Sequence, residues 1–160
     1  MMRVLIVRLS SMGDLVQTMP ALTDAARARP DIRFDWVVDE SFAQVATWHP
    51  SVETVIPSAF RRWRREPLRA YRSGEARAFL KKLRAQKYDL VVDVQCELKS
   101  ALAARLARGV RHGYDRASVH EWGAQAFYQH QHSDAKSQLA RTIRQRPNQS
   151  IYRDKRAPHL

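Results

Sequence analysis

Short apolar runs alternate with segments of helical periodicity along most of this chain, and this alternation constrains the fold more than any other feature. The runs that predict strands are 3–9, 34–38, 53–56, 88–94 and 110–114. The segments that predict helices are 14–29, 41–48, 74–87 and 98–107. Strands joined by helices favour βαβ units, so we expect an α/β protein with a doubly wound parallel sheet.

Two regions and one proline depart from this alternation. Residues 58–73 are rich in arginine and lack a clear period, which predicts an irregular loop. Pro20 predicts a break or a first turn within the first helix, with Thr18 as a possible cap. Residues 133–160 are mostly polar, with seven basic and two acidic residues, and predict a disordered or loosely helical tail. We therefore expect one domain over residues 1–132, followed by this tail.

Charge and cysteine content limit the partners and the compartment. The chain has 160 residues, 44% of them hydrophobic, and a formal net charge of +12, which favours an anionic partner. Cys96 is the single cysteine, so no internal disulfide forms and a reducing, cytoplasmic compartment is expected. No apolar stretch approaches the roughly 20 residues of a membrane span. Basic patches still allow attachment to a membrane surface.

The stretch "SSMGD", residues 10–14, connects the first strand to the first helix. In a parallel sheet, ligands bind at the carboxyl ends of the strands, where this loop lies. Amide groups of Ser10, Ser11 and Gly13 at a helix start favour an anion, and glycine lets a ligand approach the backbone. The loop is neither a Walker motif nor Gly-x-Gly-x-x-Gly, so it specifies no particular phosphate ligand.

Asp14 at the end of this loop has two interpretations. Aspartate at a helix start is a common cap, worth about 1 kcal/mol. Alternatively, a carboxylate facing the cleft can take a proton from a substrate hydroxyl as a general base. A helix N-terminus stabilises the charged carboxylate and so lowers its basicity.

Several segments together resemble the bacterial lipopolysaccharide heptosyltransferases of type I. The similar stretches cover most of residues 2–132 and are "MRVLIVRLSSMGDLVQTMPAL", "IRFDWVVDESFAQVATWHPSVETVIP", "RRWRRE", "YDLVVDVQCELKSALAARLARG", "RHGYDR" and "AFYQHQH". The resemblance implies a Rossmann-like domain, the N-terminal, acceptor-binding half of a GT-B glycosyltransferase. It implies inverting transfer of heptose from ADP-heptose to a Kdo sugar of the lipid A-linked inner core, without metal or other cofactor.

The resemblance also implies roles for residues of this chain. Asp14 matches the family's general base, and the departure of ADP as the acceptor attacks compensates for its low basicity. The implied place of work is the cytoplasmic face of the inner membrane, in peripheral contact with it, and no nucleic acid is expected as a partner. The candidate acceptor-binding residues are Ser10, Ser11, Gly13, Arg61, Arg62, Arg64, Gln95 and Lys99.

Each of these candidates also has a simpler interpretation. The arginines around Trp63 belong to residues 61–87, which hold eleven basic residues and two acids, and most charge runs are solvated faces. Asp93 could cap the helix that follows it, and Lys99 could be merely exposed. His112 and Asp115 end the last predicted strand, which allows a position in the cleft, although a turn with a surface histidine is more common. The remaining aromatic and histidine side chains are predicted as core (Trp36, Trp48, Phe34, Phe79) or surface (His130, His132).

The sequence departs from the family pattern in three ways. Cys96 and Glu97 replace a glycine and an apolar residue, which crowds a tight turn and adds negative charge. His120 and Trp122 stand where the family has arginine and proline, so a cation is weakened or lost. The family's second domain, which binds ADP-heptose, has no counterpart here. We therefore expect little transferase activity from the chain alone, because the donor would not be positioned.

Two other readings stay open at this point. A basic Rossmann-like module could bind nucleic acid or another polyanion without catalysis, as the net charge permits. No nucleic-acid-binding motif is visible, and the arginine cluster has one tryptophan rather than a row of stacking aromatics. A poorly folding remnant is the third reading, which a cooperative thermal transition would exclude.

Overall fold

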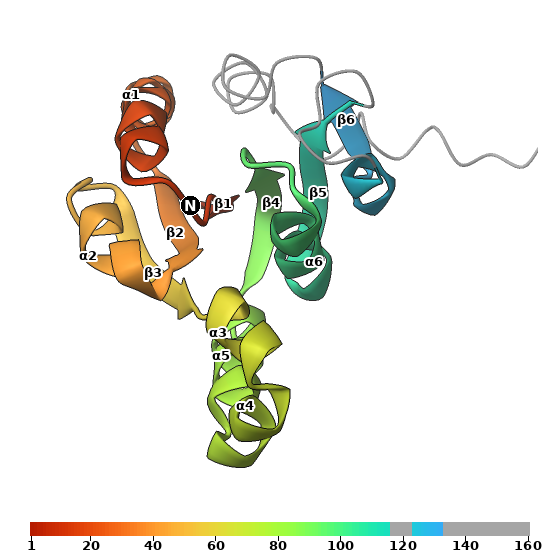
Figure 1. Ribbon diagram of the computed structural model, residues 1–160. Helices are drawn as coiled ribbons and strands as arrows, with labels where there is room; N and C mark the ends of the chain where they lie inside the picture. The colour runs from red at the N-terminus through yellow and green to blue at the C-terminus, as the bar shows by residue number, and fades with distance from the viewer. Residues whose placement is uncertain (116–122, 133–160) are drawn as a thin grey trace, which may run out of the picture.

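The computed structural model describes residues 1–115 and 123–132, and its centre is a parallel sheet (Figure 1). The six strands of this region lie in the order β3-β2-β1-β4-β5-β6, and every neighbouring pair is parallel. This order is that of a Rossmann-like doubly wound sheet. The strands are β1 (Met2–Val7), β2 (Ile32–Asp39), β3 (Val52–Ser58), β4 (Lys87–Asp93), β5 (Arg108–Tyr114) and β6 (His130–His132).

Helices cover both faces of the sheet, as the alternation of elements predicts. The helices are α1 (Met12–Ala28), α2 (Ala43–Ala46), α3 (Phe60–Arg65), α4 (Pro67–Ser73), α5 (Glu75–Arg84) and α6 (Leu98–Leu106). Two 3-10 turns, η1 (Glu40–Phe42) and η2 (Ala124–Phe127), complete the described elements. No helix of residues 1–115 and 123–132 is long and apolar enough to cross a membrane.

Strand β1 shows how the two cores are divided. Val4 and Ile6 pack with the buried side chains of α1 and α2, whereas Leu5 and Val7 pack with those of α5 and α6. All four side chains are fully buried. Because successive side chains of a strand point to opposite faces, an apolar run without alternation requires cover on both sides.

The arginine-rich segment 58–73 is helical, which corrects the predicted irregular loop. Helix α3 places Phe60 and Trp63 on one side, where both rings contact Phe79 of α5 edge to face at centroid distances of 5.4–5.5 Å. Pro67 opens α4, where its missing amide hydrogen costs nothing. The periodicity was hidden because the apolar residues lie on two short helices rather than one.

Other local expectations also need correction. Helix α1 runs through Pro20 without a break, and Thr18 does not cap it, since its hydroxyl donates to the Asp14 carbonyl at 2.8 Å. Trp48, predicted as core, is 59% exposed, because the short helix α2 ends before it. Strand β6, which was not predicted, pairs with β5. The tail 133–160 and the pair His120 and Trp122 lie outside the described residues.

Candidate functional site

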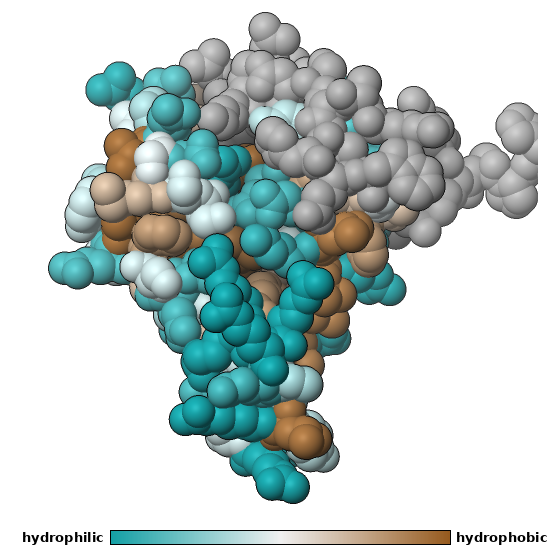
Figure 2. Space-filling model, viewed as in Figure 1, coloured by the Kyte–Doolittle hydropathy of each residue, from teal (hydrophilic) through white to brown (hydrophobic). Residues whose placement is uncertain are grey.

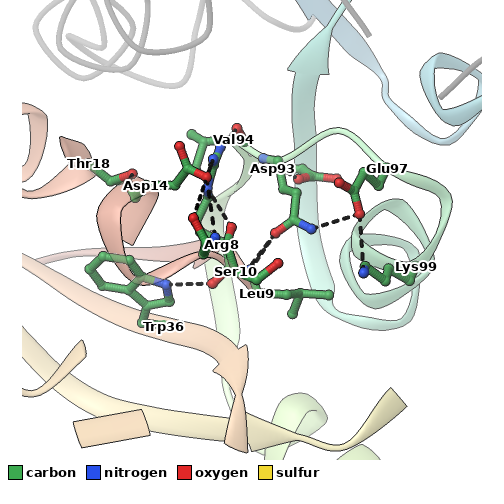
Figure 3. Close-up of polar contacts among 12 residues, drawn as sticks. Arg8, Leu9, Ser10, Asp14, Thr18, Trp36, Asp93, Val94, Glu97 and Lys99 are labelled. Atoms are coloured by element: carbon green, nitrogen blue, oxygen red, sulfur yellow. Dashed lines mark hydrogen bonds and ion pairs between the residues drawn. The ribbon is translucent and has the colours of Figure 1, made fainter. Parts of the chain in front are cut away.

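The loop after β1 lies at the point where the strand order reverses. Chain connections run from β1 toward β2 and β3 on one side, and from β4 toward β5 and β6 on the other. The loops after β1 and β4 therefore meet at the carboxyl edge of the sheet, where doubly wound proteins bind ligands. Figure 3 shows residues of both loops in contact.

Gln95 joins the two loops. Its side-chain Oε1 accepts hydrogen bonds from the backbone N–H groups of Leu9 at 2.7 Å and Ser10 at 3.1 Å. Its Nε2 donates to Oε2 of Glu97 at 2.8 Å. Gln95 is 2% exposed, so the structure places this predicted acceptor-binding residue beneath the loop, as its support.

The loop after β1 is also held from the β2 side. The Trp36 indole Nε1 donates to the Arg8 carbonyl at 3.1 Å, and the backbone N–H of Asp39 donates to the Leu9 carbonyl at 3.0 Å. Trp36 is fully buried. Contacts from both neighbouring strands leave the loop little freedom, which is the condition for holding a catalytic group in one geometry.

Arg8 also belongs to this site, although the sequence did not single it out. It is 7% exposed, and its guanidinium donates from Nε to the Ser10 carbonyl at 3.1 Å and from Nη1 to the Val94 carbonyl at 2.6 Å. Its Nη2 forms an ion pair with Oδ2 of Asp14 at 3.0 Å (Figure 3). The only sequence signal was a cation directly after an apolar strand.

Asp14 occupies the first turn of α1, with Ser11 as the N-cap. Its Oδ2 accepts hydrogen bonds from the Ser11 hydroxyl at 2.9 Å and the Ser11 backbone N–H at 3.3 Å, in addition to the Arg8 ion pair. These Ser11 hydrogen bonds, followed by the Arg8 charge, lower the pKa of Asp14 below its ordinary value. The side chain is 41% exposed.

The two carboxylate oxygens of Asp14 therefore differ. Every contact that the described residues make with this carboxylate falls on Oδ2, and Oδ1 has no partner among those residues. Asp14 thus belongs to the helix cap and also presents a charged oxygen at the carboxyl edge of the sheet. The nearby Gly13 is open, since a Cβ built there meets nothing within 4 Å.

Asp93 organises the loop after β4 from within. It is fully buried, and its Oδ1 accepts from the backbone N–H groups of Gln95 and Cys96, both at 2.9 Å. Its Oδ2 accepts from the Ser100 hydroxyl at 2.8 Å and the Tyr128 hydroxyl at 2.5 Å. Burial raises the pKa of Asp93 to about 6, against the opposing effect of these hydrogen bonds. The N-cap of α6 is Glu97, so the expectation that Asp93 caps this helix is wrong.

Cys96 stands at a strained backbone position in the same loop. Its φ of 56° lies in the left-handed region, which L residues other than glycine rarely adopt. The side chain is fully buried, with Sγ donating to the Asp93 carbonyl at 3.0 Å and accepting from the Tyr114 N–H at 3.2 Å. The expected crowding at this turn therefore takes the form of backbone strain.

The Cys96 thiol is expected to be inert in the folded protein. Burial raises its pKa to about 12, so almost no thiolate forms near neutral pH, and reagents have no access to it. A maleimide should modify Cys96 only in denaturant, as measured by mass spectrometry at matched reaction times. Rapid modification under native conditions would contradict the buried position.

Lys99 and Glu97 form a pair at the start of α6. Lys99 Nζ lies 3.3 Å from Glu97 Oε2, the same oxygen that accepts from Gln95 (Figure 3). The Lys99 side chain is 45% exposed, so it remains accessible to an anion. The negative charge expected from Glu97 is present, and it is compensated locally by Lys99.

The arginine cluster contributes to the same edge of the sheet. Arg62 forms ion pairs with Glu40 at 3.1 Å and Glu75 at 2.7 Å, which raise its pKa. Arg64 is exposed and does not line the cavity found here. A cavity of about 300 Å³ is lined by Asp39, Glu40, Ser41, Ala59, Arg61, Arg62, Arg65 and Glu66.

This cavity adjoins the loop of Asp14, since the Asp39 backbone is hydrogen bonded to Leu9. Arg61 is exposed at its rim, and Arg62 is already neutralised by two carboxylates. Of the predicted arginines, Arg61 is therefore better suited than Arg62 to bind a new anion.

The histidines of β5 and β6 lie together, and His130 and His132, which were predicted as surface residues, are half-buried. His112 is 3% exposed, and its Nδ1 lies 3.1 Å from Nε2 of His132 on β6. The His112 ring also stacks on His130 at a centroid distance of 4.6 Å. Within residues 1–115 and 123–132, no group of three histidine, cysteine or acidic side chains has an arrangement suited to a metal ion.

Comparisons with known proteins agree with this structure. Residues 76–144 match the model of glycosyltransferase family 9 (heptosyltransferase). Lipopolysaccharide heptosyltransferase 1 of Escherichia coli strain K12 is 53% identical over 140 residues, which is 87% of this chain and 44% of that protein. The Pseudomonas aeruginosa protein of the same name is 52% identical over 128 residues, covering 79% of this chain and 36% of that protein.

A solved structure extends the likeness to three dimensions. The E. coli heptosyltransferase WaaC, in a structure with ADP-2-deoxy-2-fluoro heptose, superposes with a TM-score of 0.80 at 48% identity, covering 89% of this chain and 47% of that one. The chain thus spans less than half the length of the curated relatives it matches. In sequence and in fold, it is similar to the N-terminal portion of lipopolysaccharide heptosyltransferase I, which confirms the resemblance found in its motifs.

Proposed function

We propose that this chain forms the acceptor-binding part of a glycosyltransferase that moves heptose from ADP-heptose to a Kdo sugar of the lipid A-linked inner core. The domain over residues 1–132 would be the N-terminal half of a GT-B enzyme. The relatives named above are lipopolysaccharide heptosyltransferases, and one was solved with an ADP-heptose analogue, which supports this substrate class. In this proposal the described residues bind the acceptor and take its proton, and no other role is given to them.

The observation that carries the proposal is the asymmetry of the Asp14 carboxylate. Arg8 and Ser11 hold Oδ2, while Oδ1, at the carboxyl edge of β1 and β4, has no partner among the described residues. An acceptor hydroxyl bound there would give its proton to Oδ1 as its oxygen forms the new bond to the anomeric carbon of heptose. The bond from that carbon to ADP breaks in the same step, and ADP leaves with the electron pair.

The lowered pKa of Asp14 suits a concerted reaction. A carboxylate of low basicity does not deprotonate an alcohol in advance, so proton transfer must accompany bond formation. A metal or other cofactor is not part of the proposal. The acceptor's carboxylate and phosphates would be bound by Arg61, Arg64 and Lys99, with the open backbone of Ser10, Ser11 and Gly13 beside them. The proposed place of work is the cytoplasmic face of the inner membrane.

Calorimetric titration of the chain with a water-soluble, deacylated Kdo-lipid A fragment tests this proposal. We expect selective binding of the fragment over a short single-stranded RNA of similar charge. Asp14→Asn should retain that binding, because the asymmetry assigns this residue to the proton rather than to affinity. Arg61→Gln should weaken it, and Asp24→Asn on the exposed face of α1 should not. Equal or tighter binding of the RNA would overturn the assignment.

A further inference from the structure

Helix α4 exposes two large apolar side chains at neighbouring positions. Leu68 is 71% exposed and Tyr71 is 73% exposed, although helices of folded proteins usually turn such residues inward. They are three residues apart and so share one face of the helix, while the buried Ala70 lies on the opposite face. The apolar pair therefore faces solvent, because the packed face of the helix is the one that carries Ala70.

Arginines surround this apolar pair. Arg69 and Arg72 lie on the same helix, and the Arg77 guanidinium of α5 lies 6.0 Å from the centre of the Tyr71 ring. Arg69 is paired with Glu66 at 3.4 Å. In the part of the chain that the structure describes, no carboxylate lies within 4 Å of Arg72 or Arg77. We call the set Leu68, Arg69, Tyr71, Arg72 and Arg77 the α4 surface.

The α4 surface lies at the end of a projection. Helix α5 packs on the sheet through Phe79 and Leu83, and α4 lies beyond it, farther from the strands (Figure 1). Figure 2 shows that the visible face of this projection is mostly hydrophilic, with a hydrophobic patch near its far end. A projecting end can meet an extended flat surface without obstruction from the sheet.

We propose that the α4 surface docks on an anionic lipid bilayer. Leu68 and Tyr71 enter the headgroup region, and the tyrosine hydroxyl stays in water. The guanidinium groups of the arginines, at the ends of long side chains, contact lipid phosphates. This inference deepens the proposed function, on which its biological meaning rests, by naming the surface that meets the membrane carrying the acceptor.

The other partners fit the α4 surface less well. A second copy of the chain would bring arginines against arginines, which opposes association. Single-stranded nucleic acid binds through successive stacked aromatic rings, and the α4 surface has one aromatic ring beside an aliphatic side chain. The positive charges of Arg72 and Arg77 beside exposed apolar side chains match an anionic, partly apolar surface.

Co-sedimentation with vesicles tests the docking surface. We expect the chain to bind phosphatidylcholine vesicles that contain phosphatidylglycerol more tightly than vesicles of phosphatidylcholine alone. The double variant Leu68→Ser, Tyr71→Ser should lose about tenfold or more in partitioning, and Arg72→Gln about fivefold. Trp48→Ser is the matched control, because Trp48 is 59% exposed outside this surface, and it should bind as the wild type does.

A fluorescent label separates docking from loose electrostatic attraction. An environment-sensitive dye on Leu68→Cys should shift to the blue with anionic vesicles, whereas the same dye on Trp48→Cys should not. The native Cys96 is buried and does not compete for the label. Unchanged vesicle binding of the α4 variants would overturn the inference. The same holds if these variants lose binding to RNA rather than to vesicles.

The two proposals fail in different ways. The Leu68→Ser, Tyr71→Ser variant should bind the soluble Kdo fragment as the wild type does, because that ligand lacks acyl chains and a bilayer. Loss of vesicle binding with retained Kdo binding supports both proposals. If the Kdo fragment does not bind while the α4 variants still lose vesicle binding, the proposed function fails and the docking surface stands.

Discussion

Replacing Asp93 by alanine is expected to lower the free energy of unfolding by about 3–4 kcal/mol. Two backbone amides and the hydroxyls of Ser100 and Tyr128 would lose their acceptor, and a buried unsatisfied polar group costs roughly 1–3 kcal/mol. Removing a desolvated carboxylate offsets part of this sum. Urea unfolding measures the change.

The exposed carboxylate of Asp24 provides the control for this prediction. Asp24→Ala on α1 should change the free energy of unfolding by no more than about 0.5 kcal/mol, as surface substitutions usually do. A loss for Asp93→Ala no larger than that of the control would mean that the carboxylate does not organise the loop after β4.

The buried position of Asp93 also predicts a pH dependence. Its pKa is about 6 in the folded protein, above the ordinary 3.8, so between these values the folded state binds more protons than the unfolded state. Stability from this group is therefore present below pH 4 and is lost as the pH rises to about 6. The free energy of unfolding of the wild type, measured against that of Asp93→Asn, isolates the effect. The wild type should lose stability relative to this variant as the pH rises from 4 to 6, and a relative gain would contradict the prediction.

Replacing Arg8 by methionine is expected to cost about 2–4 kcal/mol and to raise the pKa of Asp14. Methionine fills the space but leaves the Ser10 and Val94 carbonyls without their charged donor. It also removes the positive charge beside Oδ2 of Asp14. Urea unfolding and an NMR titration of the Asp14 carboxyl carbon measure the two effects.

Two further variants make the Arg8 prediction sharper. The Ser11 hydroxyl is the largest single cause of the lowered pKa of Asp14, so Ser11→Ala should also raise that pKa, while the backbone N–H of residue 11 keeps its hydrogen bond. Arg8→Lys should retain part of the charge effect but lose stability, because an ammonium group cannot reach three acceptors in the same fork geometry. An unchanged Asp14 pKa in Arg8→Met would show that the ion pair does not form in solution.

Local sequence patterns were sufficient for most of the sheet. The run Val4–Leu5–Ile6–Val7 predicts a strand buried on both faces because nothing polar interrupts it, and the structure places it in the middle of the sheet. The motif around Asp14 identified the loop and the helix start that the structure contains. Segment 58–73 was missed because its apolar residues Phe60 and Trp63 on α3 pack on Phe79 of another helix, α5, so the contacts leave no period within the segment itself.

The sequence by itself determined the order of most elements, the core on both faces of the sheet and Asp14 as the candidate catalytic residue, because these depend on spacing and residue type. Only the tertiary structure decided how that residue is held. Arg8 meets Val94, and Gln95 meets Leu9, across separations of 86 residues along the chain. Such pairs leave no local periodicity, since parallel strands bring their carboxyl ends together only after the whole sheet has formed.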